Sequence, residues 1–479
     1  MYRFNLSAPG TMFLCGEPNR RNKTCIAASL DMRTTLTFSS FPSRVVVIEF
    51  IGINFPSIQL NVKIPLRQLF IHFYGKHYRK WTRVTLHETV KNFVTSMTDY
   101  EGTYEFSNQT HQLSLQAFFF LLVLISQKER IIITASFIVK LSTELPIGEG
   151  LGSSASFAVC LAACFWRWHL LQKGNVVYEF STQDLLKISN YAQNCESSIY
   201  NSSTCIDTII STYGMIKIFD GGITSTPRSK FFSNIPCIKI LLVFSNVDQE
   251  TKSEKSMKII SVKNSYSFLD SILKSIEVMS TTIISVLDII NTKICNNLKK
   301  INRLSDCPLI DITDDYKILM DVIHMNQGLL KSLGMSHPNL DIICAIARKF
   351  LFAAKLAGKS GSRCAFILLP RATSEDILDL ITEFESFNFS TKVATLNCNG
   401  IRNIIHVNQE LLKTLGMSHS NSDIICAIDQ KFLFSGKIAS EGDFILLSDS
   451  TDENIQGLTT TFEMQIIVLA SFELQRIEN

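Results

Sequence analysis

The fold of this chain is decided by the stretch Pro146-Ile-Gly-Glu-Gly-Leu-Gly-Ser-Ser-Ala155. Glycines at 148, 150 and 152 let the backbone turn tightly and approach a ligand with no Cβ in the way. Ser153 and Ser154 then open a helix, where free N–H groups and the helix dipole favour a phosphate. A serine hydroxyl at this point can also reach a Mg²⁺ ion. The stretch therefore predicts a phosphate-binding loop that leads into a helix.

Other interpretations of the three glycines must be weighed, because Gly-x-Gly-x-Gly alone is weak evidence. A dinucleotide-binding fold would place the loop after its first strand, with an acidic residue about twenty positions later. Here the loop lies in mid-domain, and Leu170 and Leu171 occupy that later position. The chain has no Gly-x-x-x-x-Gly-Lys-Ser/Thr sequence, which argues against a P-loop enzyme. A purely structural turn at the start of a helix stays open on this pattern.

The segments around the loop combine strand-like and helical patterns. We expect strands at residues 2–6, 11–15, 26–39, 44–55 and 131–141, and helices at 85–126, 154–171 and 183–198. The most apolar run, from Ala117 to Ile125, has roughly half the length that a bilayer span needs, so it predicts a buried helix. Together these patterns indicate an α+β unit that ends near residue 229.

A second α+β unit is expected over residues 230–402. Its first strand is 238–244, and long helices follow at about 262–298 and 315–333. Gly334 ends the second of these helices, and Pro338 lies in the first turn of the next one. A glycine- and serine-bearing turn within 355–369, a helix at 374–387 and a strand at 392–396 complete the unit. We therefore predict domains at 1–229 and 230–402, with a separate segment at 403–479.

The segment 403–479 contains an internal repeat. Residues 324–356 recur 82 positions later as residues 406–438, with 23 of 33 positions identical. Two unrelated helix pairs would not share this identity, and two copies are too few for a solenoid. In the second copy the stretch corresponding to 357–366 is four residues shorter, so its glycine turn is missing. We interpret 403–479 as a partial, degenerate repeat of the second domain.

Composition bounds the function classes. The 479 residues are 46% hydrophobic and 19% charged, with a net charge of +3, which argues against binding to nucleic acid or to an anionic membrane surface. The N-terminus lacks the pattern of a secretory signal. The 13 cysteines are scattered and include no Cys-x-x-Cys pair. Free thiols in a reducing cytoplasm are the expectation.

Two further motifs flank the loop in chain order. They are Ala8-Pro-Gly-Thr-Met-Phe-Leu-Cys-Gly-Glu17 and Lys355-Leu-Ala-Gly-Lys-Ser-Gly-Ser-Arg-Cys364. With the loop 146–155 they resemble the three motifs of the GHMP kinases, over about residues 3–400. Residues 325–330 and 333–341 resemble the mevalonate kinases within that family. The resemblance implies an α+β fold of two domains that meet at a cleft.

The resemblance also implies a reaction and its residues. The enzyme would transfer the γ-phosphoryl group of ATP to mevalonate, giving 5-phosphomevalonate early in isoprenoid and sterol precursor synthesis, and similar enzymes are usually homodimers. Asp207 matches the catalytic base, Ser154 and Glu196 match the Mg²⁺ ligands, and Glu17 and Thr251 match substrate-binding positions. The residues that match the ATP-binding loop are Pro146, Gly148, Gly150, Leu151, Gly152, Ser153, Ser154 and Ala155. Carboxylates suit this chemistry, because phosphoryl transfer needs metal binding and an oriented hydroxyl.

Several positions depart from the family pattern. Thr11 replaces a lysine that stabilises developing charge, and one such contact is typically worth roughly 10²- to 10³-fold in rate. Pro18 replaces a substrate-contacting histidine, and Cys205 replaces a glycine near the base. In the third motif the changes are Ser360, Ser362 and Arg363, each in place of a glycine, and Glu149 adds a negative charge to the phosphate loop. An alternative is therefore an impaired relative that binds nucleotide or a partner. A GHMP kinase with another substrate is a third interpretation.

Overall fold

The computed structural model describes residues 2–16, 24–41, 49–74, 81–175, 179–202, 204–220, 228–232, 235–245, 269–301, 312–358, 362–407, 435–438 and 444–447. Its helices are α1 (Leu66–Phe73), α2 (Arg83–Ser96), α3 (Gln109–Glu129), α4 (Ser153–Gln172), α5 (Thr182–Ile199), α6 (Ile206–Tyr213), α8 (Leu269–Ile301), α9 (Thr313–Ser332), α10 (Pro338–Lys349) and α11 (Ser374–Ser386), with a 3₁₀ turn η1 (Pro56–Ile58). Its strands are β1 (Arg3–Cys15), β2 (Thr24–Ser40), β3 (Phe50–Phe55), β4 (Leu60–Pro65), β5 (Glu101–Gly102), β6 (Phe137–Thr143), β7 (Ile216–Asp220), β8 (Arg228–Phe231), β9 (Ile238–Phe244), β10 (Ala354–Leu356), β11 (Cys364–Leu368), β12 (Ser390–Leu396), β13 (Arg402–Val407), β14 (Ser435–Ile438) and β15 (Phe444–Leu447). The mixed helices and strands confirm the α+β class.

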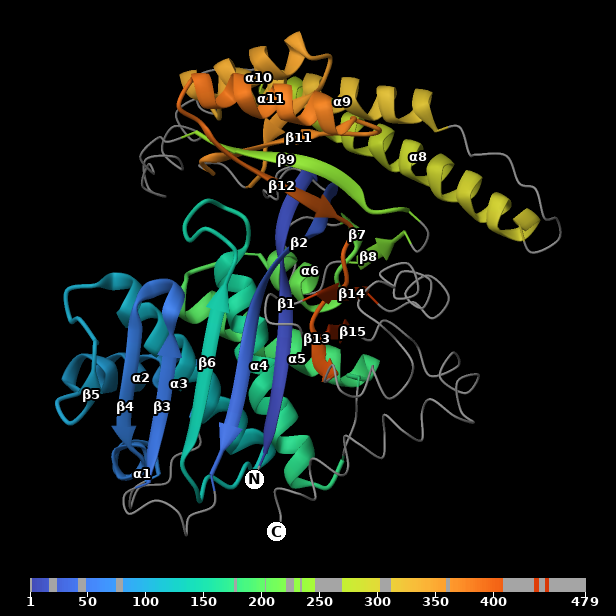
Figure 1. The fold of residues 1–479 in the computed structure, drawn as a ribbon. Coiled ribbons are helices and arrows are strands. Elements are labelled where there is room, and N and C mark those ends of the chain that lie inside the picture. The colour runs from blue at the N-terminus through green and yellow to red at the C-terminus, as the bar shows by residue number, and fades with distance from the viewer. Residues whose placement is uncertain are drawn as a thin grey trace.

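The N-terminal lobe is a sheet with helices on one face (Figure 1). Strands follow one another in the order β5-β4-β3-β6-β2-β1, and all pairs are antiparallel except β3 with β6. The segments expected as two strands form the single strand β1, whose pairing with β2 shifts register between Pro9 and Thr11. The segment 85–126, expected as helical throughout, is two helices, because the chain leaves α2 and forms β5 before α3 begins.

Helices α3 and α4 form the centre of this lobe. Both are long and apolar enough to span a membrane, but 78% and 83% of their most apolar windows are buried inside the protein. The side chains of Phe118, Phe119 and Phe120 are fully buried. The helices are apolar all round because neighbours surround them, which is typical of a core helix. The buried helix predicted at Ala117–Ile125 is confirmed.

The C-terminal lobe has a smaller sheet, in the order β10-β11-β9-β12, whose inner strand β9 is covered on both faces. Ile240 and Leu242 of β9 pack toward α8 and α9, whereas Leu241 and Val243 pack toward α10 and α11. A strand covered on both faces needs a continuous apolar run, and β9 has one from Ile240 to Phe244, after the exposed Lys239. In Figure 1, α9, α10 and α11 are drawn above the strands of this sheet, and α8 extends to the right of them. Pro338 occupies the first turn of α10 as predicted, after the N-cap residue His337.

The long strand β2 joins the two lobes. One edge pairs with β1 along most of its length, and the other edge pairs in turn with β7, β12 and β6. Leu30 of β2 lies opposite Leu396 of β12, so the two sheets are continuous. The strand that the two sheets share also contributes Thr34 to the cavity described below.

The repeated segment behaves differently in its two copies. His324 lies inside α9, but the equivalent His406 lies in β13, so the two copies differ in secondary structure at this position. Pairing with β1 and β15 fixes residues 404–407 as strand and overrides their local preference. Strands β14 and β15 form an antiparallel hairpin, as β10 and β11 do in the first copy. Residues 408–434, 439–443 and 448–479 lie outside the described ranges.

Candidate functional site

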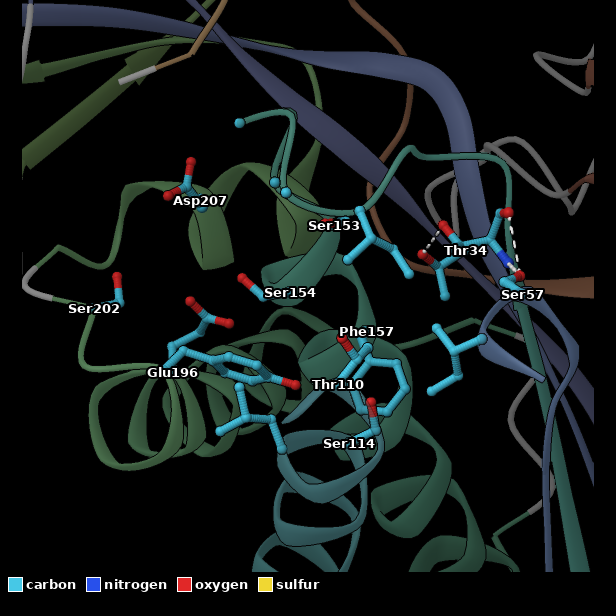
Figure 2. Close-up of a pocket in the computed structure, with 18 of the residues that line it drawn as sticks. Thr34, Ser57, Thr110, Ser114, Ser153, Ser154, Phe157, Glu196, Ser202 and Asp207 are labelled. Carbon is cyan, nitrogen blue, oxygen red and sulfur yellow. Dashed lines mark hydrogen bonds between the residues drawn. The ribbon is translucent and has the colours of Figure 1, made fainter. Parts of the chain in front are cut away.

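A cavity of about 540 Å³ lies at the glycine loop (Figure 2). Its walls come from the loop, the first turn of α4, the end of α5, the start of α6, the region around η1 and the start of α3. Asp207, Ser154 and Glu196 lie on one side of this cavity, and Thr34 and Ser57 lie on the other. Ser57 and Asp207 are 150 positions apart in the sequence, so distant segments contribute to one site.

The loop needs its glycines for conformational and steric reasons. Gly148, Gly150 and Gly152 have φ values of 85°, 82° and 72°, a region that favours glycine. A Cβ on Gly152 would lie 2.2 Å from the Thr11 hydroxyl oxygen. Gly152 is the N-cap residue of α4, so no side chain caps the first N–H groups of the helix, and Ser153 and Ser154 of this first turn line the cavity. This geometry suits an anion.

The other predicted loop residues divide into two groups. Ser153 and Ser154 line the cavity together with the three glycines. Leu151 and Ala155 are fully buried in the protein core, and Pro146 is half-buried outside the cavity wall. These three residues therefore support the backbone of the loop and do not line the cavity themselves.

The two predicted carboxylates come together at this cavity. Glu196 lies in the last turn of α5 and is 3% exposed, and Asp207 lies in the first turn of α6. They converge because the chain turns back between Ile199 and Ile206. Figure 2 shows the Ser154 hydroxyl between them. Tyr200 also lines the cavity, and burial, with the nearby Cys195 and Glu196, raises the pKa of its phenol well above the usual value.

Thr11 contacts the predicted base directly. Its hydroxyl donates a hydrogen bond of 2.9 Å to Oδ1 of Asp207. Its backbone N–H donates to the Leu151 carbonyl, also at 2.9 Å, so this hydrogen bond anchors the glycine loop to β1. Thr11 is 1% exposed. The residue that replaces the family's lysine therefore still contacts the carboxylate, through a neutral hydroxyl.

The third motif contacts the phosphate loop through two of its substituted glycines. Nη2 of Arg363 lies 2.6 Å from Oε1 of Glu149, and the Ser362 hydroxyl donates to the Glu149 carbonyl at 2.6 Å. The negative charge expected at Glu149 is therefore paired with a positive one. Burial raises the pKa of the Glu149 carboxyl, and the Arg363 guanidinium opposes that rise.

The sequence did not predict one wall of the cavity. Ser57 of η1 and Thr110 and Ser114 of α3 line it, as does Phe157 of α4. The Ser57 hydroxyl accepts a hydrogen bond of 2.9 Å from the Thr143 N–H, which links η1 to β6. These residues belong to no recognisable motif. Polar side chains at the start of an apolar helix are common, so the sequence carries no signal that they line a site. Glu17, Pro18 and Thr251 lie outside the described residues.

The residues at the site can accept a divalent cation. The Ser154 hydroxyl and the Glu196 carboxylate are hard oxygen donors that lie near each other on one side of the cavity. In the part of the chain that the structure describes, no three His, Cys, Asp or Glu side chains cluster to hold a metal by themselves. Two protein oxygens suit Mg²⁺, which is usually completed by substrate phosphates and water.

Comparisons with known proteins show which proteins this chain is similar to in sequence and in fold. Residues 121–215 match the sequence profile described as the GHMP kinases N terminal domain. The chain is 28% identical to a human mevalonate kinase over 371 residues, covering 76% of this chain and 85% of the human protein. It is 26% identical to a mevalonate kinase of Candida albicans, covering 84% and 90%. A crystal structure of the Methanococcus jannaschii mevalonate kinase superposes with a TM-score of 0.56 at 16% identity, covering 83% of this chain and 99% of that one. The L. major mevalonate kinase in complex with R-mevalonate gives 0.52 at 13% identity, covering 84% and 97%.

Proposed function

We propose that this chain, a homologue of the mevalonate kinases with the N-terminal domain and fold of the GHMP kinases, phosphorylates mevalonate with ATP. The observation that carries the proposal is the convergence of Asp207, Glu196 and Ser154 at the end of the glycine loop. Kinase chemistry needs a base, metal-binding oxygens and a phosphate cradle at one point, and these residues supply all three.

Each residue has a role in the proposed reaction. The phosphates of ATP would lie on the N–H groups of the loop and of the first turn of α4. Asp207 would accept the proton of the primary hydroxyl of mevalonate as its oxygen attacks the γ-phosphorus, and the bond to the ADP oxygen breaks. The Thr11 hydroxyl holds Asp207 by a hydrogen bond of 2.9 Å, which fixes the carboxylate for this transfer.

The nucleoside end of ATP has room in the same cavity. The wall formed by Phe55, Ser57, Thr110 and Phe157 combines apolar surface with a few hydroxyl groups, which suits a base and a ribose. It lies across the cavity from Asp207, as Figure 2 shows for its labelled residues. We infer that the nucleoside occupies this side and that mevalonate enters near Asp207.

The finer assignments are also proposals. We infer that Ser154 and Glu196 hold Mg²⁺, which when bound would neutralise phosphate charge. Glu17 and Thr251 are proposed to contact mevalonate on the strength of the sequence motifs. The division at 1–229, 230–402 and 403–479, a homodimer and a cytoplasmic location are retained as proposals on the same grounds.

A coupled ADP-release assay tests the function. We expect Mg-ATP turnover that depends on mevalonate and that Asp207→Ala abolishes. Asp379→Ala, which changes an exposed carboxylate of α11, is the matched control and should keep wild-type activity. If Mg-ATP raises the melting temperature but mevalonate causes no ADP release, the site binds nucleotide and the proposed reaction is wrong.

A further inference from the structure

Two departures from the glycine motifs meet in space. Glu149 lies in the phosphate loop of the N-terminal lobe, and Arg363 directly precedes β11 in the C-terminal lobe. Their side chains form an ion pair with an N–O distance of 2.6 Å, and they are 15% and 29% exposed. Taken separately, each change looks damaging, because one adds a negative charge near phosphate and the other adds bulk to a tight loop. Their contact indicates that the two changes compensate each other.

A second contact anchors the same loop. Ser362 lines the cavity and donates its hydroxyl proton to the Glu149 carbonyl at 2.6 Å, although the two residues are 213 positions apart. A Cβ built on Gly150 would lie 2.8 Å from the Ser362 Cβ, and one on Gly358 would lie 2.5 Å from the Gly150 carbonyl oxygen. The third motif therefore packs directly on the phosphate loop, and the serine fills the space against Gly150.

The charge balance of the loop depends on Arg363. Without its partner, the Glu149 carboxylate would be a partly buried negative charge beside the site for the ATP phosphates. Like charges repel strongly in a site of low effective dielectric constant. With the guanidinium 2.6 Å away, the pair presents no net charge to the nucleotide. The contact of Nη2 with Oε1 also holds this carboxylate oxygen on the side of Arg363.

We propose that Arg363 is a positioning residue for ATP: it clamps the phosphate loop from the second lobe and cancels the charge of Glu149. It acts through Glu149 and not by contact with the phosphates. The proposal rests on the proposed function only in taking ATP as the ligand. It predicts that removing the arginine weakens ATP binding and that removing the glutamate as well restores it.

The test is a double-mutant cycle on the full chain, with Mg-ATP affinity measured by titration calorimetry in the absence of mevalonate. Arg363→Met should weaken Mg-ATP binding by roughly tenfold or more, since an uncompensated carboxylate remains. Glu149→Gln should change it by less than about threefold, and the double variant should return to within about threefold of wild type. Arg363→Lys keeps the charge and should retain most of the affinity. Lys349→Met breaks the exposed pair with Glu383 and is the control expected to have no effect.

Several results would overturn the proposal. If the double variant binds as weakly as Arg363→Met, the arginine does not act through Glu149. Wild-type affinity in Arg363→Met would show that the pair is irrelevant to the nucleotide. Melting temperatures without ATP identify a variant that fails to fold, and Arg363→Lys and the double variant then decide. Where turnover is measurable, Arg363→Met should raise the KM for ATP and leave the KM for mevalonate unchanged.

The cycle also separates this proposal from the kinase assignment. If Mg-ATP binds with the expected double-mutant cycle but mevalonate is not turned over, the proposed function is wrong and the role of Arg363 in ATP binding is supported. A wild-type protein that binds no Mg-ATP would refute both.

Discussion

The hydrogen bond from Thr11 to Asp207 should be measurable in the rate of phosphoryl transfer. Thr11→Val keeps the shape of the side chain and removes only the hydroxyl, which is buried and donates at 2.9 Å. A hydrogen bond to a charged group contributes about 1.5 to 3 kcal/mol. If that energy is used to hold the carboxylate for proton transfer, kcat should fall by about 10- to 150-fold, because about 1.4 kcal/mol corresponds to a factor of ten.

The assay is steady-state ADP release with both substrates varied. Thr11→Ser keeps the hydroxyl and is the matched control, so it should retain most of the wild-type kcat. The KM for ATP should not change in either variant, because the bond is made to the base and not to the nucleotide. A kcat for Thr11→Val within about twofold of wild type would refute the reasoning and show that Asp207 is held by other contacts.

Three other perturbations should give separate readouts. Glu196→Gln should raise the Mg²⁺ concentration for half-maximal activity by at least about tenfold, because a metal-binding oxygen loses its charge. Gly152→Ala should lower the melting temperature and weaken ATP binding, since φ is 72° and the new Cβ would clash with Thr11, whereas Gly328→Ala in α9 meets no atom within 4 Å and should stabilise the protein slightly. Burial lowers the pKa of Lys217 from 10.5 to about 8. Between pH 8 and 10.5 the unfolded chain therefore binds more protons than the folded chain, and the lysine's contribution to the free energy of unfolding should rise over this range. Lys217→Met should remove that rise in urea unfolding measured at several pH values, and an unchanged pH profile would show that the lysine is well solvated.

The sequence could predict those parts of the fold that local pattern determines. The loop at 146–155 and its helix have a recognisable chemistry, and the apolar run of α3 has no place except a core. The approach of Glu196 and Asp207 was also predictable, because it occurs within one short helix–turn–helix segment. In each case the relevant contacts are close in sequence or carried by a motif.

The rest depends on contacts between distant segments. The pairing of Glu149 with Arg363 could not be derived from either motif, because each residue looks unfavourable without its partner. His406 adopts a strand although its duplicate His324 is helical, since β-sheet pairing outweighs a weak local preference. Thr110 enters the site because of where α3 packs, which its own sequence does not reveal.

The pairing of β1 with β13 can form only late in the synthesis of the chain. Asn5 lies opposite Ile404, so β1 waits for almost 400 further residues to be synthesised before this pairing can form. At a translation rate of about 5–20 residues per second, the delay is roughly 20 to 80 seconds. During that time the edge of β1 at Asn5 to Ser7 lacks its β13 partner, and an unpaired strand edge can pair with other chains. Productive folding of this protein in the cell should therefore depend on chaperones that shield this edge until β13 has been made.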